Sequence, residues 1–313
     1  MSIFLGIDTS NYTTSCALYD TDTCEVVSLK RLLPVKKGEK GIRQSDAVFH
    51  HTKQLPELIE QLLAEKKDID AVSWSCAPRN AQGSYMPCFL AGESAARSIC
   101  AALGIKGFAT HHQTGHILAA LYSCKRLDLL KSNKSFVALH VSGGTTDMLL
   151  CRPDEQNVLD ITHIGGTLDL NAGQAVDRVG VAMGIDFPCG PQLEMLAAKS
   201  EKSFSVKPVI KGKCCCLSGL ENMCMKMLSD GAEPSDVARF CLEYIASSIK
   251  AITLSALDEF GTMPVIFAGG VMSDKLIRDT LCEIPDRWFA EPEFSCDNAV
   301  GVALFGAVKK GLV

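Results

Sequence analysis

Aromatic residues and long apolar runs are both scarce in this chain. Phe, Trp and Tyr make up 6% of its 313 residues, and only two residues are Trp. No apolar run reaches the roughly 18 residues that a membrane-spanning helix needs. The stretch "MSIFLGIDTS" at the start lacks a basic segment and a cleavage site, so it predicts a first strand rather than a signal peptide. We therefore expect a globular cytoplasmic protein without a membrane partner.

A surplus of positive charge is missing as well. The formal net charge is −5 at pH 7 and the isoelectric point is about 5.8, so the surface as a whole is not built to attract nucleic acid. Basic residues do gather in three short segments, at 30–40, 125–134 and 207–213. Each segment taken alone is more readily explained as a solvated loop. If a nucleic acid binds, these segments are the candidate phosphate contacts.

Cysteine spacing of the zinc-binding kind is absent, although the chain has 15 cysteines. Most of them lie in apolar segments, which is typical of reduced cysteines that serve as small hydrophobic residues. The run Cys214–Cys216, with Cys224 nearby, contains no CxxC pair, and adjacent cysteines cannot readily turn toward one ion. The sequence therefore predicts free thiols here rather than a metal site.

The order of apolar segments predicts an α/β protein made of two similar halves. Residues 3–10 and 16–21 are typical of a hairpin, and residues 49–66 carry apolar side chains at helical spacing. Residues 136–152 repeat the opening pattern of strand, turn and strand. Further helices are expected at about 171–184, 190–199, 217–228 and 234–259. Two halves that begin alike suggest a duplicated α/β lobe, with a ligand in the cleft between the lobes.

Two histidines, His112 and His116, stand four residues apart in the predicted helix "HHQTGHILAALYS". Residues four apart lie on one helix face, so both imidazoles can reach one divalent ion, and a carboxylate is the usual third ligand. The alternative is that both are ordinary polar helix residues. A zinc peptidase of the HExxH type is disfavoured, because position 113 is Gln and the base for a hydrolytic water is missing.

Turns rich in glycine and hydroxyl residues follow several predicted strands. They are "GIDTSNYTTS" (6–15), "VSGGTTD" (141–147), "FPCGPQLE" (187–194) and "FAGGVMSD" (267–274). Backbone N–H groups in such turns can face a phosphate, because a glycine has no Cβ in the way. One glycine pair is weak evidence, but several such strand ends favour a nucleotide site. The Rossmann GxGxxG and P-loop patterns are absent.

The same motifs stand in the order of a known family. The set "GIDTS", "THHQTGH", "FVALHVSGGTT", "GGTLDLNAGQAVDRVG", "FPCGPQLE", "FAGGVMSD" and "DNAVGVAL" resembles the tRNA threonylcarbamoyladenosine transferase family (TsaD type, formerly glycoprotease) over roughly residues 3–310. The resemblance implies an actin/sugar-kinase/Hsp70-like (ASKHA) fold, which is α/β with two duplicated lobes and an inter-lobe cleft. It implies a first lobe at 1–106 plus 297–313 and a second at 107–296.

The resemblance also implies a metal site formed by His112, His116 and Asp297, the last from "CDNAVG". Fe2+ or Zn2+ is the expected ion, and Asp8 and Asp297 are the expected catalytic carboxylates. Threonylcarbamoyl-AMP, or ATP or ADP, is the expected nucleotide ligand. Its implied binding residues are Val141, Ser142, Gly143, Gly144, Thr145, Asp177, Gly190, Glu194, Gly269, Gly270 and Asp274.

The implied reaction is transfer of the threonylcarbamoyl group from threonylcarbamoyl-AMP to N6 of adenosine 37 in tRNA, with the metal as a Lewis acid. The target base would be presented unstacked from the anticodon loop. The implied partners are tRNA, a TsaB-like companion subunit and an ATPase subunit.

The sequence departs from the family pattern at several predicted site positions, among them Tyr12, Thr13, Ser45, Thr145 and Asp274. Carboxylates are lost at 12, 13 and 45, and one hypothesis names three nearby substitutes: Asp46, His50 and His51. These departures leave two other functions open. One is a carbamoyl or phosphoryl transferase that acts on a small molecule. The other is a non-catalytic nucleotide-binding scaffold of a tRNA-modifying complex.

Overall fold

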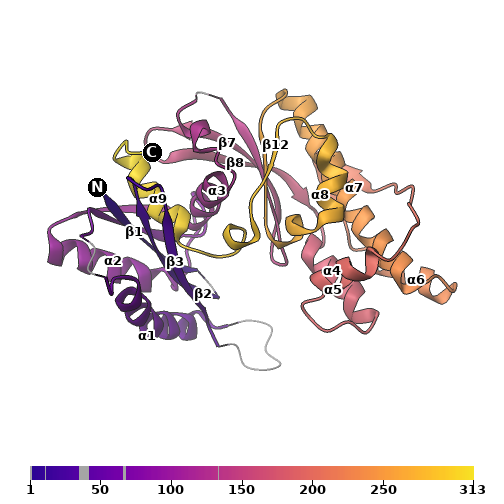
Figure 1. Cartoon of the computed structure of the whole chain (residues 1–313), viewed down its shortest axis with the longest axis horizontal. Coiled ribbons are helices and arrows are strands. Elements are labelled where there is room, and N and C mark those ends of the chain that lie inside the picture. Colours follow the sequence, from indigo (N-terminus) through magenta and orange to yellow (C-terminus); the bar gives the residue numbers. More distant parts are fainter. Residues whose placement is uncertain (1, 11, 35–41, 66–67, 133) are drawn as a thin grey trace. The chain divides into compact units, whose positions relative to one another are not determined.

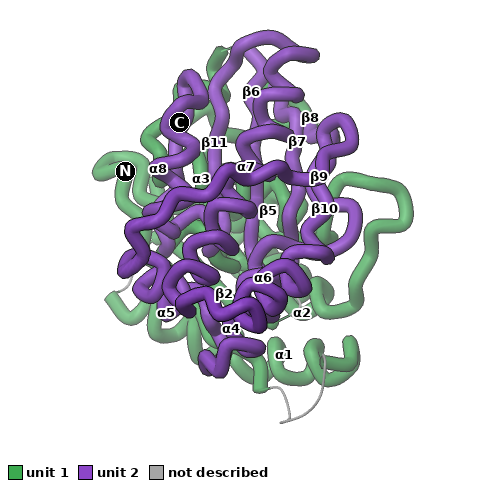
Figure 2. The backbone as a smooth tube through the Cα atoms, turned by 90° about the vertical axis from the view of Figure 1, so that its right-hand side faces the viewer, with its two compact units in different colours: residues 1–132, 153–160, 293–313 green, residues 133–152, 161–292 purple. Residues whose placement is uncertain are grey.

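The computed structural model describes residues 2–10, 12–34, 42–65, 68–132 and 134–313. The chain forms two compact units (Figure 2). Unit 1 comprises Met1–Ser132, Pro153–Asp160 and Glu293–Val313, and unit 2 comprises Asn133–Arg152 and Ile161–Pro292. Unit 1 thus extends beyond the lobe boundary implied after residue 106. The lobe boundaries given above stay a prediction.

Unit 1 contains a sheet of five strands, in the order β3-β2-β1-β4-β5. The strands are β1 (Ile3–Ser10), β2 (Thr13–Asp20), β3 (Val26–Leu32), β4 (Ala71–Ala77) and β5 (Lys106–His111). β1 pairs with β2 in antiparallel register, which confirms the expected hairpin, and it pairs with β4 in parallel register. The parallel strands β1, β4 and β5 end at the same edge of the sheet, which is where the histidine helix begins.

Helices cover both faces of this sheet (Figure 1). They are α1 (Gln44–Leu62), α2 (Phe89–Leu103), α3 (His112–Ser123) and α9 (Val300–Lys309). Because side chains alternate along a strand, Ile3, Leu5 and Ile7 of β1 pack in the core with α1 and α2. The intervening residues of β1, which include Gly6 and Asp8, therefore lie on the face toward α3 and α9.

Two glycines let α9 approach its neighbours at backbone distance. A Cβ on Gly6 would lie 2.4 Å from the backbone nitrogen of Ala303. A Cβ on Gly301 would lie 1.8 Å from the carbonyl oxygen of Gly115, so α3 and α9 touch through their backbones. Contacts this close fix the start of α9 against the helix that carries both histidines.

Unit 2 is built on a sheet of seven strands, in the order β12-β11-β6-β7-β8-β10-β9. The strands are β6 (Phe136–Val141), β7 (Thr146–Asp154), β8 (Val158–Thr167), β9 (Val209–Lys211), β10 (Cys214–Cys216), β11 (Val265–Ala268) and β12 (Arg287–Phe289). β6 pairs with β7 in antiparallel register and with β11 in parallel register. The predicted strand, turn and strand of residues 136–152 is therefore confirmed.

The helices of unit 2 are α4 (Ala172–Ala182), α5 (Gly190–Ala197), α6 (Leu220–Ser229), α7 (Pro234–Phe260) and α8 (Lys275–Thr280). Short 3-10 turns at Leu127–Leu130, Gly270–Ser273, Leu281–Glu283 and Pro292–Phe294 complete the described elements. By length and composition α7 could cross a membrane, but 61% of its apolar window is buried. Its buried side chains belong to the hydrophobic core of unit 2, which accounts for its apolar character.

Candidate metal and nucleotide sites

His112 and His116 occupy the first turns of α3, directly after β5 ends at His111. The two rings meet edge to face, with an angle of 76° between their planes, 2.9 Å between their Nε2 atoms and 4.3 Å between ring centroids. Both side chains are largely buried, with 19% and 13% of their surfaces exposed. The predicted pairing on one helix face is therefore present.

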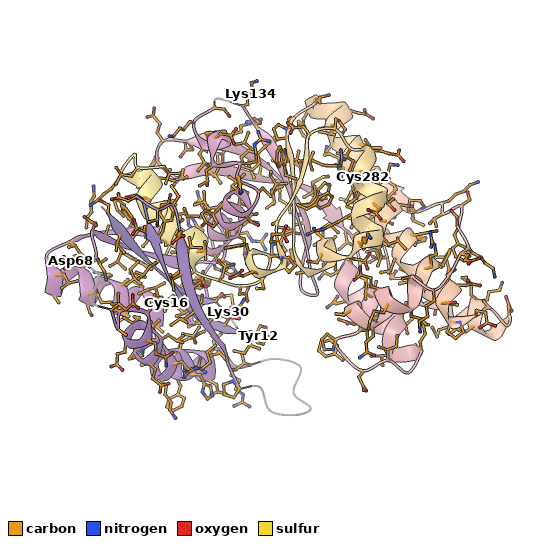
Figure 3. The ribbon with its side chains drawn as sticks, in the orientation of Figure 1. Tyr12, Cys16, Lys30, Asp68, Lys134 and Cys282 are labelled. Atoms are coloured by element: carbon orange, nitrogen blue, oxygen red, sulfur yellow. The ribbon has the colours of Figure 1, made fainter. Side chains whose placement is uncertain are left out.

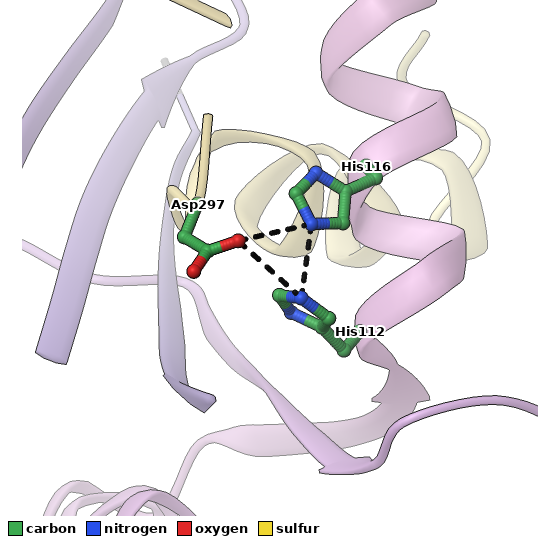
Figure 4. A group of neighbouring side chains, drawn as sticks. All are labelled: His112, His116 and Asp297. Atoms are coloured by element: carbon green, nitrogen blue, oxygen red, sulfur yellow. Dashed lines mark hydrogen bonds and ion pairs between the residues drawn. The ribbon is translucent and has the colours of Figure 1, made fainter. Parts of the chain in front are cut away.

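Asp297 reaches the histidines from the segment that precedes α9 (Figure 4). Its Oδ1 lies 3.3 Å from Nε2 of His116 and 3.7 Å from Nε2 of His112. The hydroxyl of Thr13 donates to the other oxygen, Oδ2, at 3.3 Å. Asn298 holds the backbone of this segment, since its Oδ1 accepts from Val300 N at 3.0 Å. Side chains from two segments of unit 1 that are far apart in the sequence, α3 and the residues before α9, thus converge.

The geometry of this group fits one metal ion. Two ligand atoms that each lie about 2.05 Å from a tetrahedral zinc are about 3.3 Å apart. The three separations between ligand atoms, 2.9, 3.3 and 3.7 Å, bracket that value. Among the described residues, His112, His116 and Asp297 are the group of His, Cys, Asp or Glu side chains close enough to hold an ion. Two imidazoles and one carboxylate suit zinc or iron and leave further coordination positions for a substrate.

Asp8 stands behind His112 and is 1% exposed. Its Oδ2 lies 2.8 Å from Nδ1 of His112 and also accepts a short hydrogen bond from the hydroxyl of Ser75. Its Oδ1 accepts from the backbone N–H of Ser10 at 2.9 Å. Burial by itself would raise the pKa of Asp8, but the charge of His112 and the hydrogen bonds from His112 and Ser75 lower it below its ordinary value.

The two carboxylates also act on the charge of His112. Burial opposes its charged form, but the charge of Asp8, the hydrogen bond to Asp8 and the charge of Asp297 together raise the pKa of His112 to about 9. A cation is therefore strongly favoured at this position. A divalent ion would take the place of that proton.

The glycine turn after β6 in unit 2 is held by backbone and side-chain contacts. Ser142 N donates to Thr145 O at 2.7 Å, and Gly173 N at the start of α4 donates to Ser142 O at 3.1 Å. Apart from the immediate chain neighbours, no atom of the described residues lies within 4 Å of a Cβ built on Gly143 or Gly144, and the same is true of Gly190 and Gly270. Packing therefore does not require glycine at these four positions, which leaves room for a ligand to approach the backbone.

The three predicted nucleotide-binding acids connect the elements around these turns. Asp177 accepts from Cys189 N at 2.9 Å, and Glu194 accepts from Lys275 N at 2.9 Å. Asp274 caps α8 by accepting from Ile277 N at 3.0 Å, and it is 8% exposed. Sequence reasoning expected Asp274 to face a ligand, whereas this oxygen is engaged with the helix it begins.

A cavity of about 570 Å³ opens in unit 2 between α5, α7 and α8. Glu194 contributes to its wall, together with Phe204, Arg239, Lys275 and Asp279. Arg239 pairs with Glu243 at 2.8 Å and also donates to Ser200 O, which ties the wall segment near residue 200 to α7. Glu194 was predicted from the sequence, but Arg239 and Glu243 were not, because a helical charge pair four apart is common on solvated faces.

The residues that depart from the family pattern take varied positions in unit 1. The side chain of Tyr12 is 39% exposed at the start of β2 (Figure 3), and Ser45 is exposed on α1. Thr13 is buried and contacts Asp297. His51 is one of the three residues named above as substitutes for a lost carboxylate. It is fully buried, with Nδ1 2.8 Å from the hydroxyl of Thr14.

The metal group lies within unit 1, and the turns and acids predicted to bind a nucleotide lie within unit 2. Each group is assembled by the elements of its own unit.

Comparison with solved structures defines the fold class. The chain is similar to component A of (R)-2-hydroxyglutaryl-CoA dehydratase from Acidaminococcus fermentans, with 17% identity, a TM-score of 0.54 and 97% of each chain covered. It is similar to a ROK family glucokinase from Streptomyces griseus, with 11% identity, a TM-score of 0.54, and 96% of this chain and 98% of that chain covered. It is also similar to HypF from T. kodakarensis, with 13% identity, a TM-score of 0.59, and 99% of this chain and 48% of that chain covered. These likenesses show the fold, and the predicted ASKHA fold is confirmed.

A family model narrows this class to one family. The model, described as "TsaD: tRNA N6-adenosine threonylcarbamoyltransferase", matches residues 28–304, which is most of the chain. The chain therefore belongs to the TsaD family, as the motifs predicted. This is a family of metal-dependent, nucleotide-utilising acyltransferases that work on tRNA.

Proposed function

We propose that this protein transfers the threonylcarbamoyl group of threonylcarbamoyl-AMP to N6 of adenosine 37 in tRNA. The observation that carries the proposal is the convergence of His112, His116 and Asp297, with separations that suit one ion, in a chain of the TsaD family. A protein without catalysis has little use for such a group beside a nucleotide-binding fold.

In this proposal, residues of unit 1 bind the metal ion. His112, His116 and Asp297 would bind Zn2+ or Fe2+, which when bound supplies a Lewis acid for the carbamoyl end of the donor. Asp8 orients His112, and Thr13 orients Asp297 through its hydroxyl. We assign Asp297 the role of metal ligand. Asp8 stays a candidate for the chemical step only through His112, because both of its oxygens are engaged inside the protein.

The residues of unit 2 hold the nucleotide. The backbone of the turn from Val141 to Thr145 and the glycines Gly190, Gly269 and Gly270 would contact the phosphate and ribose. Gly190 and Gly270 are open, whereas Gly269 is not, since its Cβ would lie 2.2 Å from Val141 O, so only its backbone is offered to a ligand. Asp177, Glu194 and Asp274 would accept hydrogen bonds from ribose hydroxyls or the adenine amine with their remaining acceptor capacity. The cavity beside Glu194 is wide enough for the adenine base.

Family membership supports a wider setting, which belongs to the same proposal. tRNA would present adenosine 37 unstacked. A TsaB-like companion subunit and an ATPase subunit would work with the chain in the cytoplasm.

Complementation tests this function. A strain that lacks its own transferase is given the wild-type chain or the His112→Ala variant, and tRNA nucleosides are measured by mass spectrometry. We expect the modified nucleoside with the wild type and a loss of at least about 100-fold with the variant. Soluble wild-type protein that yields no modified nucleoside would refute the proposal.

A second candidate rests on the altered positions. Tyr12 has an exposed aromatic ring and directly precedes Thr13, which contacts Asp297. An aromatic ring at this position suits an acceptor other than the family's usual one. In this case the protein would be a carbamoyl or phosphoryl transferase that acts on a small molecule. ATP turnover stimulated by a small hydroxyl or amine acceptor, in the absence of tRNA, would favour it. A non-catalytic scaffold would show neither activity and would bind nucleotide alone.

A further inference from the structure

The carboxylate of Asp8 is buried where no substrate reaches it, yet it touches a proposed metal ligand. Asp8 is 1% exposed and lies on the face of β1 that is turned toward α3 and α9. Its Oδ2 accepts from both His112 Nδ1 and Ser75, and its Oδ1 accepts from Ser10 N. The hydroxyl of Ser15 donates to the carbonyl oxygen of Asp8 itself at 3.2 Å, which fixes the backbone as well.

We infer that Asp8 is a positioning residue, which with Ser75 holds the ring of His112 so that Nε2 presents its lone pair to the metal. The inference rests on the proposed metal site. It gives Asp8 a role through His112 and not in contact with metal or substrate.

The contact with Asp8 determines which ring nitrogen of His112 is left to bind the ion. A neutral imidazole carries one N–H, and the nitrogen without it is the metal ligand. A carboxylate can only accept, so at 2.8 Å it keeps the proton on Nδ1 of His112. Nε2, which lies 3.7 Å from Asp297 and 2.9 Å from Nε2 of His116, is then free to bind the ion.

The contact with Asp8 also fixes the orientation of the His112 ring. Apart from its contact with His112, the Asp8 carboxylate is held by two donors from two strands, the hydroxyl of Ser75 on β4 and the backbone N–H of Ser10 on β1. A ring held at Nδ1 by such a rigid partner loses its freedom to rotate away from the ion. The His112 side chain therefore loses less conformational entropy when the metal binds, and the affinity for the metal is higher.

The Asp8→Asn substitution removes the charge of the carboxylate but keeps the volume of the side chain. The amide has nearly the same shape as the carboxylate but presents one oxygen and one NH2 group. If the NH2 group faces His112, the ring is driven to carry its proton on Nε2. If it faces Ser10, it meets an N–H donor and the side chain turns. Either arrangement disfavours the metal-binding form of the ring.

The experiment measures metal affinity with Zn2+ and a competing chromophoric chelator, at one pH, for the full chain. We expect Asp8→Asn to weaken Zn2+ binding about 10- to 100-fold, and Ser75→Ala to weaken it several-fold, about 3- to 10-fold. Ser73→Ala is the matched control, because Ser73 is a buried serine on the same strand whose hydroxyl has no hydrogen-bond partner among the described residues. It should bind Zn2+ like the wild type. Melting in EDTA reports the stability of each metal-free variant.

A second readout separates positioning from a structural role. In the Zn2+-loaded wild type, nitrogen-15 NMR of His112 should show a slowly exchanging proton on Nδ1 and a metal-bound Nε2. Ser75→Ala should keep this pattern with faster exchange, and Asp8→Asn should lose the Nδ1 proton. If Asp8→Asn does not fold, the comparison of Ser75→Ala with Ser73→Ala decides.

Wild-type affinity and an unchanged Nδ1 proton in Asp8→Asn would overturn the inference, as would equal affinities of Ser75→Ala and Ser73→Ala. His112→Ala tells the two proposals apart. If it binds Zn2+ like the wild type, the metal site itself fails. If it loses Zn2+ while Asp8→Asn does not, only the role of Asp8 fails.

Discussion

Asp274 carries a charge that its surroundings disfavour. Burial raises its pKa to about 6 from the ordinary 3.8, the charge of Glu194 adds to the rise, and the hydrogen bond from Ile277 N opposes it. The pKa in the folded protein thus lies above the unfolded value, so folding favours the protonated form. The contribution of Asp274 to stability is fully present below pH 3.8 and is lost as the pH rises to about 6.

We therefore expect Asp274→Asn to stabilise the protein at pH 7 by on the order of 2 kcal/mol, because asparagine caps a helix as well as aspartate without a buried charge. The gain should shrink as the pH falls from about 6 to about 4, where the wild-type carboxyl is protonated. Urea denaturation at the two ends of this range measures it. A gain that is equal at both would contradict the role given to the charge.

His51 is the opposite case, a base buried in its neutral form. Burial lowers its pKa to about 4 from 6.5, against a smaller opposing effect of the Asp8 charge. Stability is fully present above pH 6.5 and is lost as the pH falls toward 4. We expect His51→Gln to lower stability at pH 7.5 by about 1–3 kcal/mol through the lost contact with Thr14, but to lose less on acidification.

Equilibrium unfolding across this acid range checks the second half of that expectation. His50→Gln on the same helix is the matched control, since His50 is only partly buried. It should follow the wild-type curve. An acid limb of His51→Gln as steep as that of the wild type would assign the acid sensitivity to other groups.

At the scale of elements, the backbone contact between α3 and α9 sets the metal geometry. A methyl group on Gly301 has no room, because it would lie 1.8 Å from the carbonyl oxygen of Gly115. We expect Gly301→Ala to push the helices apart, to destabilise the protein by about 1–3 kcal/mol, and to weaken Zn2+ binding at least about 10-fold by moving Asp297.

Thermal unfolding and chelator competition together measure this effect. Gly219→Ala is a suitable control, because no atom lies within 4 Å of its Cβ and its backbone is not left-handed. If Gly301→Ala keeps wild-type affinity for Zn2+, the placement of Asp297 does not depend on this contact.

Most of these elements could be predicted from local patterns, and the misses have a common cause. The hairpin of β1 and β2 and the helices α4 to α7 follow apolar spacing that is visible in the sequence. The helix expected at 49 begins at Gln44 instead. Its first turn shows no apolar stripe, and what holds it is the contact of Ala47 with Leu33 and Phe89 from other elements. Local periodicity cannot contain that information.

The same limit applies to the metal group. The spacing of His112 and His116 is local, so the sequence alone predicted that they lie on one helix face. Asp297 was predicted only from the resemblance to the family. Ser75 was not predicted, and Thr13 was noted only as a departure from the family pattern, because strand pairing and helix packing alone bring these residues to the metal group. A serine at the end of an apolar strand gives no sign of its partner.

At the scale of the whole molecule, two hydrophobic cores belong to two units. Because a ligand stabilises the unit that binds it by RT ln(1 + [L]/Kd), a concentration about 100 times Kd adds about 2.7 kcal/mol. We expect Zn2+ to protect unit 1 and ADP to protect unit 2. Calorimetry with hydrogen exchange read by peptide measures this.

His112→Ala should abolish the zinc effect and leave the ADP effect in place. Protection of unit 1 peptides by ADP alone, or of unit 2 peptides by Zn2+ alone, would contradict the assignment of the two sites to separate units.

The position of α9 late in the chain delays assembly of the metal group during synthesis. His116 leaves the ribosome early, but its partner Asp297 and the helix that seats on β1 emerge only after more than half the chain has followed. A nascent or prematurely stopped chain therefore exposes the open sheet face of unit 1 and cannot capture the ion.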